Sequence, residues 1–318
     1  MRSREPGGVV RPLALPATVV APPPSTGRAR VRWGYSLSIV GVHALSLLAL
    51  WGWFFSWTGL VACVLGLYVF GTLGINIGFH RLLTHRSFAC PRWVERTLAI
   101  LGVCSLEEGP GRWVAIHRQH HQHSDEQPDP HSPLVAFLWG HVGWLLVNNS
   151  ATDTMHLYQR YSRDLMSQAF YLKLERRLAW MWVYIAHAAA LAGVTALIAW
   201  AATGNAALAG RLAASMVVWG VLVRTVLVWH ITWSVNSLSH LFGYQSHDTG
   251  ENSRNNWLVA LISNGEGWHN NHHADPRSAA HGHRWFELDV SYLTIVVMEK
   301  MGLAWKVMRH DRRGAALE

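Results

Sequence analysis

Four apolar stretches of bilayer length constrain the fold of this chain more than any other feature of its sequence. They run over residues 36–56, 58–79, 178–201 and 213–236. About 20 consecutive apolar residues form a helix that is long enough to cross the hydrocarbon core of a bilayer. Charged residues make up only 14% of the chain, against about 25% in ordinary soluble domains. The sequence therefore predicts an all-α membrane protein with four transmembrane helices.

Three further segments do not qualify as spans. The apolar runs at 94–105 and 134–147 are too short to cross a bilayer, so we expect them to lie in the interface or to fold back against the bundle. Residues 1–35 are rich in Pro, Ala and Arg and show no periodicity, which predicts a disordered tail. The integral membrane domain is then expected to comprise residues 36–318.

Positive charge predicts the orientation of the chain in the membrane. Of the 27 Arg and Lys residues, all but Arg211 and Arg224 lie in the tail, in residues 80–177 or in residues 237–318. By the positive-inside rule, these segments and both termini are cytoplasmic, and 80–177 and 237–318 form a cap. Since the basic residues alternate with apolar runs and form no separate basic domain, we expect no nucleic-acid partner. The preference for Arg over Lys favours a bacterial inner membrane.

Histidines gather where the chain leaves the predicted spans on the cytoplasmic side. In an α-helix, positions i, i+3 and i+4 lie on one face, so each HxxHH motif is expected to direct three imidazoles to one point. The two histidines of HRLLTH are five residues apart and would face two points unless the helix ends there. This arrangement predicts a dimetal centre in the cap. The motifs are HRLLTH with His80 and His85, HRQHH with His117, His120 and His121, NSLSH with Asn236 and His240, and HNNHH with His269, His272 and His273.

The ligand type narrows the choice of metal. Imidazoles without recurring Cys or Asp exclude a thiolate site and argue against Mg or Ca, which leaves Zn, Cu, Fe or Ni. A single HxxHH motif could equally be a set of hydrogen-bonded helical histidines, but four motifs on one side of a four-span protein favour metal binding. Four neighbouring histidines could support the ligands from behind, but solvated loop positions are favoured for them: His123, His131, His281 and His283.

These motifs, in this order and spacing, resemble the membrane fatty acyl desaturase family, and in particular its Δ9 type, over roughly residues 60–305. The matching stretches are GFHRLLTHRSF (78–88), HRQHHQHSDEQPDPHSP (117–133), GHVGWLL (140–146), TWSVNSLSHLFGY (232–244) and GEGWHNNHHADP (265–276).

The resemblance implies an oxidoreductase that introduces a cis double bond at Δ9 into a saturated acyl chain, with O₂ as co-substrate. It implies that the nine histidines of the motifs hold two iron ions, cycling between Fe²⁺ and Fe³⁺, and that Asn236 reaches one iron through water. No catalytic residue is implied beyond the metal centre. Three residues match the bend of the family's acyl tunnel: Trp113, Thr232 and Trp233.

The acyl carrier stays open between coenzyme A and a membrane glycerolipid. Ala115 and Ile116 stand where animal acyl-CoA desaturases carry an Arg-Asp pair that grips coenzyme A, and this departure favours an acyl-lipid substrate slightly. Arg112 and Arg118 remain available in the sequence as phosphate ligands. An acyl-CoA substrate is therefore retained as the alternative.

The electrons for such a reaction must come from a separate protein, because nothing in the chain binds flavin or haem and three scattered Cys cannot hold an iron–sulfur cluster. A ferredoxin, a rubredoxin or a cytochrome b5 type donor with its reductase is expected, and an acidic donor fits the basic cytoplasmic face. Two other functions compete: a fatty acyl or alkane-type hydroxylase on the same scaffold, and a His-rich membrane metal-binding protein or transporter. Glu107 and Glu108, just before HRQHH, have no role in any of these hypotheses.

Overall fold

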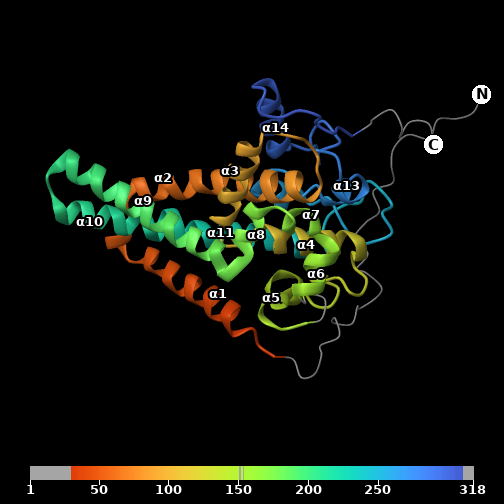
Figure 1. Cartoon of the computed structure of the whole chain (residues 1–318), viewed down its shortest axis with the longest axis horizontal. Helices are drawn as coiled ribbons and strands as arrows, with labels where there is room; N and C mark the ends of the chain where they lie inside the picture. Colours follow the sequence, from red (N-terminus) through yellow and green to blue (C-terminus); the bar gives the residue numbers. More distant parts are fainter. Residues whose placement is uncertain (1–29, 150–151, 153, 311–318) are drawn as a thin grey trace, which may run out of the picture.

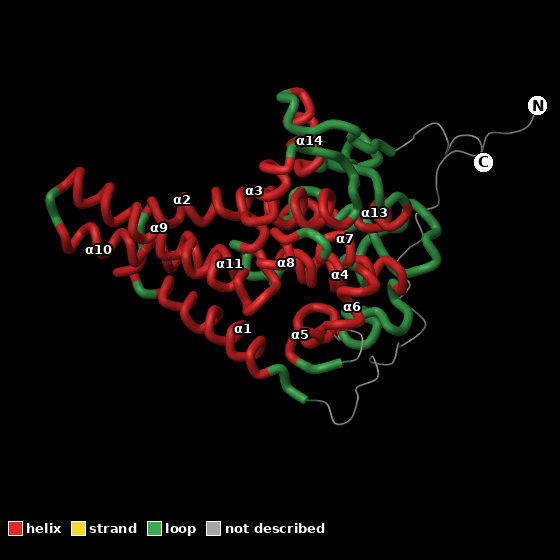
Figure 2. Tube along the Cα trace, viewed as in Figure 1, coloured by secondary structure: helices red, strands yellow, loops and turns green. Residues whose placement is uncertain are grey.

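The computed structural model describes residues 30–149, 152 and 154–310. In this part of the chain the secondary structure is helical, and the only β pairing consists of isolated bridges (Figure 2). The prediction of an all-α protein is confirmed.

The helices, in chain order, are α1 (Trp33–Ser46), η1 (Leu47–Leu50), η2 (Gly52–Phe54), α2 (Trp57–Gly66), η3 (Leu67–Thr84), α3 (Arg92–Val103), α4 (Pro110–His123), η4 (Trp139–Gly143), α5 (Trp144–Leu146), α6 (Thr154–Tyr161), α7 (Arg163–Met166), α8 (Ala169–Glu175), η6 (Arg176–Leu178), α9 (Ala179–Thr203), α10 (Ala206–Ser215), η7 (Met216–Val223), α11 (Arg224–Leu238), α12 (Trp257–Ile262), α13 (His269–Ala274) and α14 (Val290–Lys300). The elements η3, η4 and η7 are π-helices.

Four of the described helical segments are long and apolar enough to cross a membrane: Trp33–Leu50, Trp57–Thr84, Ala169–Thr203 and Ala206–Leu238. The number of predicted spans is therefore confirmed. The second and fourth, with 28 and 33 residues, exceed the roughly 20 residues that a bilayer requires. Both run on past the predicted ends, residues 79 and 236, so their last turns project into the cap. In Figure 1 the long helices extend to the α9–α10 turn at one end, and α4, α6 and α13 gather at the other.

The link between the third and fourth spans is shorter than predicted. Only Gly204 and Asn205 separate α9 from α10, whereas the sequence suggested a link over residues 202–212. Gly204 ends α9 in the left-handed conformation (φ 65°), and the Asn205 side chain accepts a hydrogen bond from the Leu208 N–H at the start of α10. Arg211 interrupted the apolar run in the sequence, but its guanidinium extends outward and donates to carbonyls of the link between α1 and α2.

The four spans differ in how much protein surrounds them. Within the most apolar window, 39% of the second span and 44% of the fourth are buried inside the protein, against 0% of the first and 6% of the third. The second and fourth spans therefore form the inner part of the bundle and carry the cap. The first and third spans lie on the outside, where a bilayer would surround them.

The two short apolar runs fold back against the bundle, as predicted. In the first run, α3 crosses η3 so closely that a Cβ at Gly74 would lie 2.5 Å from the Gly102 backbone nitrogen. In the second run, η4 packs against α11 and α5 packs against α1. Neither run crosses the bundle as a span.

The start of the membrane domain lies earlier than the sequence indicated. Residues 1–29 of the predicted tail lie outside the described residues, but residues 30–35 do not form a tail. Val31 pairs with Val147 in an isolated bridge, and the Arg32 N–H donates to the Leu146 carbonyl. This pairing fixes the beginning of α1 against the cap.

The side chain of Arg224, which lies within the fourth span, is held by contacts inside the protein. Its Nη1 donates to the Cys104 carbonyl at 2.7 Å and its Nε donates to the Gly220 carbonyl, while the guanidinium lies 4.1 Å from the centre of the Phe70 ring. These contacts supply hydrogen bonds and a cation–π partner for a charge that would be costly in lipid. Arg224 therefore connects the fourth span to the end of α3 and to the second span.

Candidate metal centre

The structure brings together all nine histidines that the sequence singled out, in two neighbouring groups. In each group one ring nitrogen from every member lies within 4.8 Å of those of the others. The groups touch, because the rings of His121 and His273 stack with centroids 4.3 Å apart. We call them the five-histidine group (His80, His85, His117, His121 and His272) and the four-histidine group (His120, His240, His269 and His273).

The HxxHH motifs do not direct three imidazoles to one point, so this expectation was wrong. In α4, His117 and His121 belong to the five-histidine group, whereas His120 belongs to the other. An α-helix turns about 100° per residue, so positions i and i+4 nearly align while position i+3 diverges from i+4 by about 100°. In α13 the same rule divides His272 from His269 and His273. Each motif therefore supplies both groups.

His80 and His85 were expected to face two points unless the helix ends there, and η3 does end at Thr84, one residue before His85. Both belong to the five-histidine group, with ring centroids 4.8 Å apart. The reason is the π-helix η3, in which the hydrogen-bonding period is five residues. The His85 N–H donates to the His80 carbonyl at 3.1 Å and so continues this period one residue beyond the helix. At this spacing the two side chains share a face.

The distances within the groups fit a divalent metal ion. Several Nε2–Nε2 distances lie near 3.0 Å: His80–His272 at 3.0 Å, His272–His121 at 2.9 Å, His117–His121 at 3.1 Å, His240–His269 at 3.1 Å and His269–His273 at 3.1 Å. Two imidazole nitrogens at about 2.1 Å from one ion and at right angles to each other are about 3.0 Å apart.

Hydrogen bonding alone does not account for these contacts. Nε2 of His272, and likewise Nε2 of His269, contacts two other Nε2 atoms, but an imidazole nitrogen cannot donate and accept at once. In addition, Nε2 of His85 and Nε2 of His120 are buried with no hydrogen-bond partner among the described residues. Buried polar atoms without a partner are rare and call for an ion or water. The histidines present therefore fit a metal centre.

The protonation states also suit metal binding. Burial, followed by the proximity of other imidazoles, lowers the pKa of most of these rings well below the ordinary value, so they are neutral at pH 7, as metal ligands must be. His240 is an exception: burial acts in the same direction, but the Asp125 carboxylate prevails and raises the pKa to about 9, so a metal ion at Nε2 would have to displace a proton. The rings with lowered pKa include His85, His117, His121, His269, His272 and His273.

Carboxylates behind the histidines were not found by sequence reasoning. Each accepts a hydrogen bond from an Nδ1–H, which fixes the tautomer so that Nε2 is left to bind a metal. Their positions close to the motifs were the available signal, but all of them lie in loops without periodicity. The pairs are His80 with Glu266 at 2.5 Å, His120 with Asp129 at 3.0 Å and His240 with Asp125 at 2.9 Å.

Glu266 also belongs to a buried ionic network. Its other oxygen accepts hydrogen bonds from Arg81 Nε and Nη2 at 3.1 and 2.7 Å, and Arg81 Nη1 donates to Asp289 at 3.0 Å. The Arg81 side chain is fully buried. The charge of Arg81 is therefore balanced by two carboxylates, one of which orients His80.

Two histidines that we expected in solvated loops are buried instead. His131 is 2% exposed and its ring lies 4.4 Å from that of His120, while His281 is 1% exposed and lies 4.3 Å from His272. Neither belongs to the five-histidine or the four-histidine group, and His131 also lines the apolar cavity described below. His123 and His283 are half-buried.

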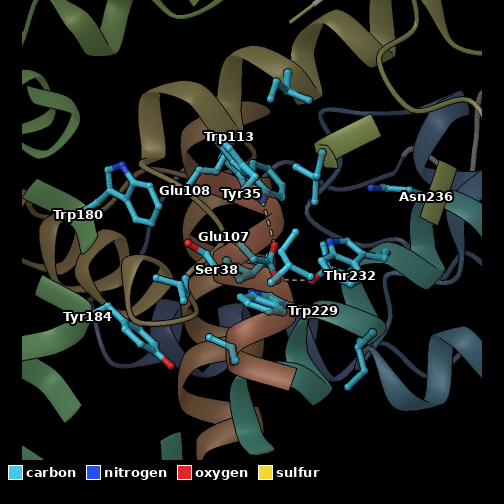
Figure 3. Close-up of a pocket in the computed structure, with 18 of the residues that line it drawn as sticks. Tyr35, Ser38, Glu107, Glu108, Trp113, Trp180, Tyr184, Trp229, Thr232 and Asn236 are labelled. Atoms are coloured by element: carbon cyan, nitrogen blue, oxygen red, sulfur yellow. Dashed lines mark hydrogen bonds between the residues drawn. The ribbon is translucent and has the colours of Figure 1, made fainter. Parts of the chain in front are cut away.

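An apolar cavity of about 610 Å³ leads to the histidine groups. His80, His117 and His269 line its inner end, and Asn236 lines it too. In Figure 3, Asn236 lies on one side of the cavity, and Trp180 and Tyr184 lie on the other. The three residues that matched a tunnel in the sequence also line the cavity: Trp113, Thr232 and Trp233. A volume of several hundred Å³ is typical of a binding site for a small organic molecule.

Glu107, for which the sequence offered no role, lies in the wall of this cavity. Its carboxylate accepts hydrogen bonds from Thr232 Oγ1 at 2.8 Å and from Trp113 Nε1 at 3.2 Å, as Figure 3 shows. Glu107 therefore connects the helix of the second motif to the fourth span. Its neighbour Glu108 faces a different partner and accepts a hydrogen bond from Arg112 at 2.9 Å.

Burial raises the pKa of Glu107 from 4.5 to about 8. Because the pKa is higher in the folded protein than in the unfolded chain, Glu107 favours the folded state fully below pH 4.5, and this contribution is lost as the pH rises through 8. We expect Glu107→Gln to remove this loss, worth up to about 5 kcal/mol at 1.36 kcal/mol per pKa unit. The thermal unfolding midpoint of the variant, measured in one detergent, should fall less between pH 5.5 and pH 8.5 than that of the unsubstituted protein.

The amide of this variant can accept the hydrogen bond from Trp113 through Oε1 and donate to Thr232 Oγ1 through Nε2. Because other effects of the substitution do not depend on pH, the slope of stability against pH tests the argument. Glu126→Gln, at an exposed position, is the matched control and should give a curve parallel to that of the unsubstituted protein. If the unfolding midpoint of Glu107→Gln also changes with pH in parallel with that of the unsubstituted protein, the raised pKa of Glu107 is contradicted.

The comparisons with known proteins agree with this site. The fatty acid desaturase family matches residues 55–290. An sn-1 stearoyl-lipid 9-desaturase of Anabaena variabilis is 38% identical over 284 residues, which cover 89% of this chain and 96% of that protein. An sn-2 palmitoyl-lipid 9-desaturase of Nostoc sp. (strain 36) is 38% identical, covering 90% and 93%. An acyl-CoA C20 Delta5-desaturase of Anemone leveillei is 37% identical, covering 84% and 79%.

The family match includes both histidine groups, and the relatives are named as desaturases of lipid-linked or coenzyme A-linked acyl chains. They favour the desaturase over the hydroxylase and the metal transporter that the sequence left open. The chain therefore belongs to the fatty acid desaturase family and is an enzyme that desaturates fatty acyl chains.

Proposed function

We propose that the two histidine groups hold two iron ions, one in each group, and that the enzyme uses O₂ to introduce a cis Δ9 double bond into an acyl chain of a membrane lipid. The observation that carries the proposal is the pair of clustered imidazole groups at the inner end of an apolar cavity. An unactivated C–H bond is beyond the reach of acid–base side chains, so the iron ions, when bound, would supply the oxidising chemistry. The acyl chain loses two hydrogens, and O₂ with two electrons and two protons becomes two waters.

The residues of the chain itself bind and position the substrate. Trp113, Thr232 and Trp233 line the cavity beside the histidine groups, and Glu107 fixes the first two relative to each other. The carbon atoms that face the ions would be selected by this part of the wall, since holding the reacting atoms in place contributes a large part of any rate enhancement. The apolar lining excludes water from the site. Asn236 would bind one ion through water.

Three structural features support a lipid-linked acyl chain over acyl-CoA. Ala115 and Ile116 are buried against Trp229 and Trp233, so they present no surface to a coenzyme A headgroup. Arg118 donates to the carbonyls of Leu83, Thr84 and Tyr161 and to the Asp164 carboxylate. Arg112 is 5% exposed and bound to Glu108. Neither arginine is placed to bind a phosphate in solution.

The electron donor is proposed to be a separate ferredoxin, rubredoxin or cytochrome b5 type protein with its reductase. The net charge of +8 and the basic residues of the cap suit an acidic donor. By the positive-inside rule, the cap and both termini face the cytoplasm, and a bacterial inner membrane is the proposed location.

The test is the fatty-acid profile of a host that expresses the protein with a compatible donor, combined with the iron content of the purified protein. New chains that are two hydrogens lighter, with a double bond at carbon 9 and first seen in intact phospholipid, would support the proposal. First appearance in the acyl-CoA pool would overturn the lipid-linked substrate. Chains that have gained one oxygen would overturn the reaction, and a protein without iron would overturn the metal.

A further inference from the structure

The apolar cavity reaches the outer surface of the protein between α1 and α9. Leu37 and Leu45 of α1 line it, as do Leu178 and Ile185 at the start of the third span. These side chains are 66%, 52%, 52% and 46% exposed. Because buried histidines line the same cavity at its inner end, one continuous space leads from the histidine groups to this surface.

The mouth lies on a surface that a membrane would cover. The first and third spans are the two that protein does not surround, with 0% and 6% of their apolar windows buried. Exposed apolar side chains on a membrane-spanning helix face lipid tails rather than water. The cavity therefore opens toward the hydrocarbon of the bilayer.

We propose that the acyl chain enters sideways from the bilayer, between α1 and α9, while it is still attached to its membrane lipid. The inference rests on the proposed function and adds the route and the surface that recognises the substrate. The chain passes from one apolar environment to another, so no methylene group has to cross water on the way. An acyl thioester that used this mouth would have to bring its charged headgroup to a surface that faces lipid.

The wall of the mouth offers a position that can be blocked. Gly41 of α1 lines the cavity, and a Cβ built on it would meet nothing within 4 Å. A large side chain can therefore be added without disturbing the packing of α1. Gly193 of α9 is a matched control, since its Cβ would also meet nothing within 4 Å but it does not line the cavity.

The experiment uses the full chain in phospholipid vesicles that contain a phosphatidylglycerol with a photoactivatable group in the middle of one acyl chain. After illumination, labelled peptides are identified by mass spectrometry. Label is expected on the α11 peptide that carries Trp229 and Thr232. Gly41→Trp should reduce this labelling by about tenfold or more, because overpacking weakens binding by that order, and Gly193→Trp should leave it unchanged.

A second variant guards against misfolding of the first. The Leu37→Cys variant folds with the mouth of the cavity still open, and its exposed thiol is modified afterwards with a bulky maleimide. The native cysteines are less accessible to this reagent, because Cys63 and Cys104 are buried and Cys90 is half-buried. Photolabelling of the α11 peptide by the lipid probe should fall when the same preparation is modified with the maleimide. Unchanged labelling in both the tryptophan variant and the modified cysteine variant would overturn the lateral route.

The test of the lateral route can be distinguished from the test of the proposed function. Iron content and double-bond formation test the enzyme, whereas lipid labelling tests the route and requires neither iron nor an electron donor. An arm with a water-soluble photoactivatable acyl-CoA decides the source of the chain. If that probe labels the same α11 peptide and the label is unaffected by Gly41→Trp, the substrate comes from water and the inference fails.

Discussion

Alanine at His120 and alanine at His121 should remove different metal ions, although the two residues are neighbours in the chain. His120 belongs to the four-histidine group and His121 to the five-histidine group. We expect the iron content of each variant to fall from about two to about one per chain, since losing a direct ligand should cost more than the 10–100-fold in affinity that is typical of outer contacts. Desaturation should fall by at least about 10²-fold in both.

Mössbauer spectra of the two iron-loaded variants provide the decisive measurement, because each spectrum should keep the signal that the other has lost. His123→Ala is the matched control: His123 is on the same helix, α4, but in neither group, and it should keep both signals and full activity. If the His120 and His121 variants lose the same signal, the division of the motif between two ions is wrong.

The substitution Glu266→Gln should strongly destabilise the fold. Among the described residues, it leaves the fully buried Arg81 with one carboxylate partner, Asp289, and it removes the carboxylate that orients His80. Removing one partner from a buried ion pair typically costs about 3–5 kcal/mol, because the remaining charge stays buried without compensation. We expect a clearly lower thermal unfolding midpoint in detergent and weaker iron binding.

An exposed ion pair provides the comparison. Arg309 contacts Glu299 at the surface, where their side chains are 49% and 30% exposed. Glu299→Gln should change the free energy of unfolding by no more than about 1 kcal/mol. If Glu266→Gln and Glu299→Gln have the same thermal unfolding midpoint, the ionic network around Arg81 does not stabilise the fold in the way that its burial suggests.

The parts of this structure that depend on local sequence could be predicted. The four spans follow from the length of apolar runs, and the nine histidines follow from their spacing and from the side of the membrane on which the spans leave them. What could not be predicted depends on backbone conformation. The π-helical period of η3, which brings His80 and His85 together, has no marker in the sequence.

The residues around the histidines were missed for a different reason. Asp125, Asp129 and Glu266 lie in irregular loops, where no periodicity shows the direction of a side chain. Glu107 stood out as a charge in an unexpected place, but its role depends on Thr232, which is 125 residues away in the chain. Such contacts are set by the packing of the spans and become visible only in three dimensions.

The division of each HxxHH motif between two ions also bears on how such sequences can change over time. Inserting or deleting a single residue inside α4 or α13 would rotate part of the motif by about 100° and would deprive both sites of ligands at once. The loops that hold Asp125, Asp129 and Glu266 share this restriction, because these carboxylates hydrogen-bond to histidines of both groups. Exposed loops away from the site accept changes in length at little cost, so changes in chain length are expected there and not beside the motifs.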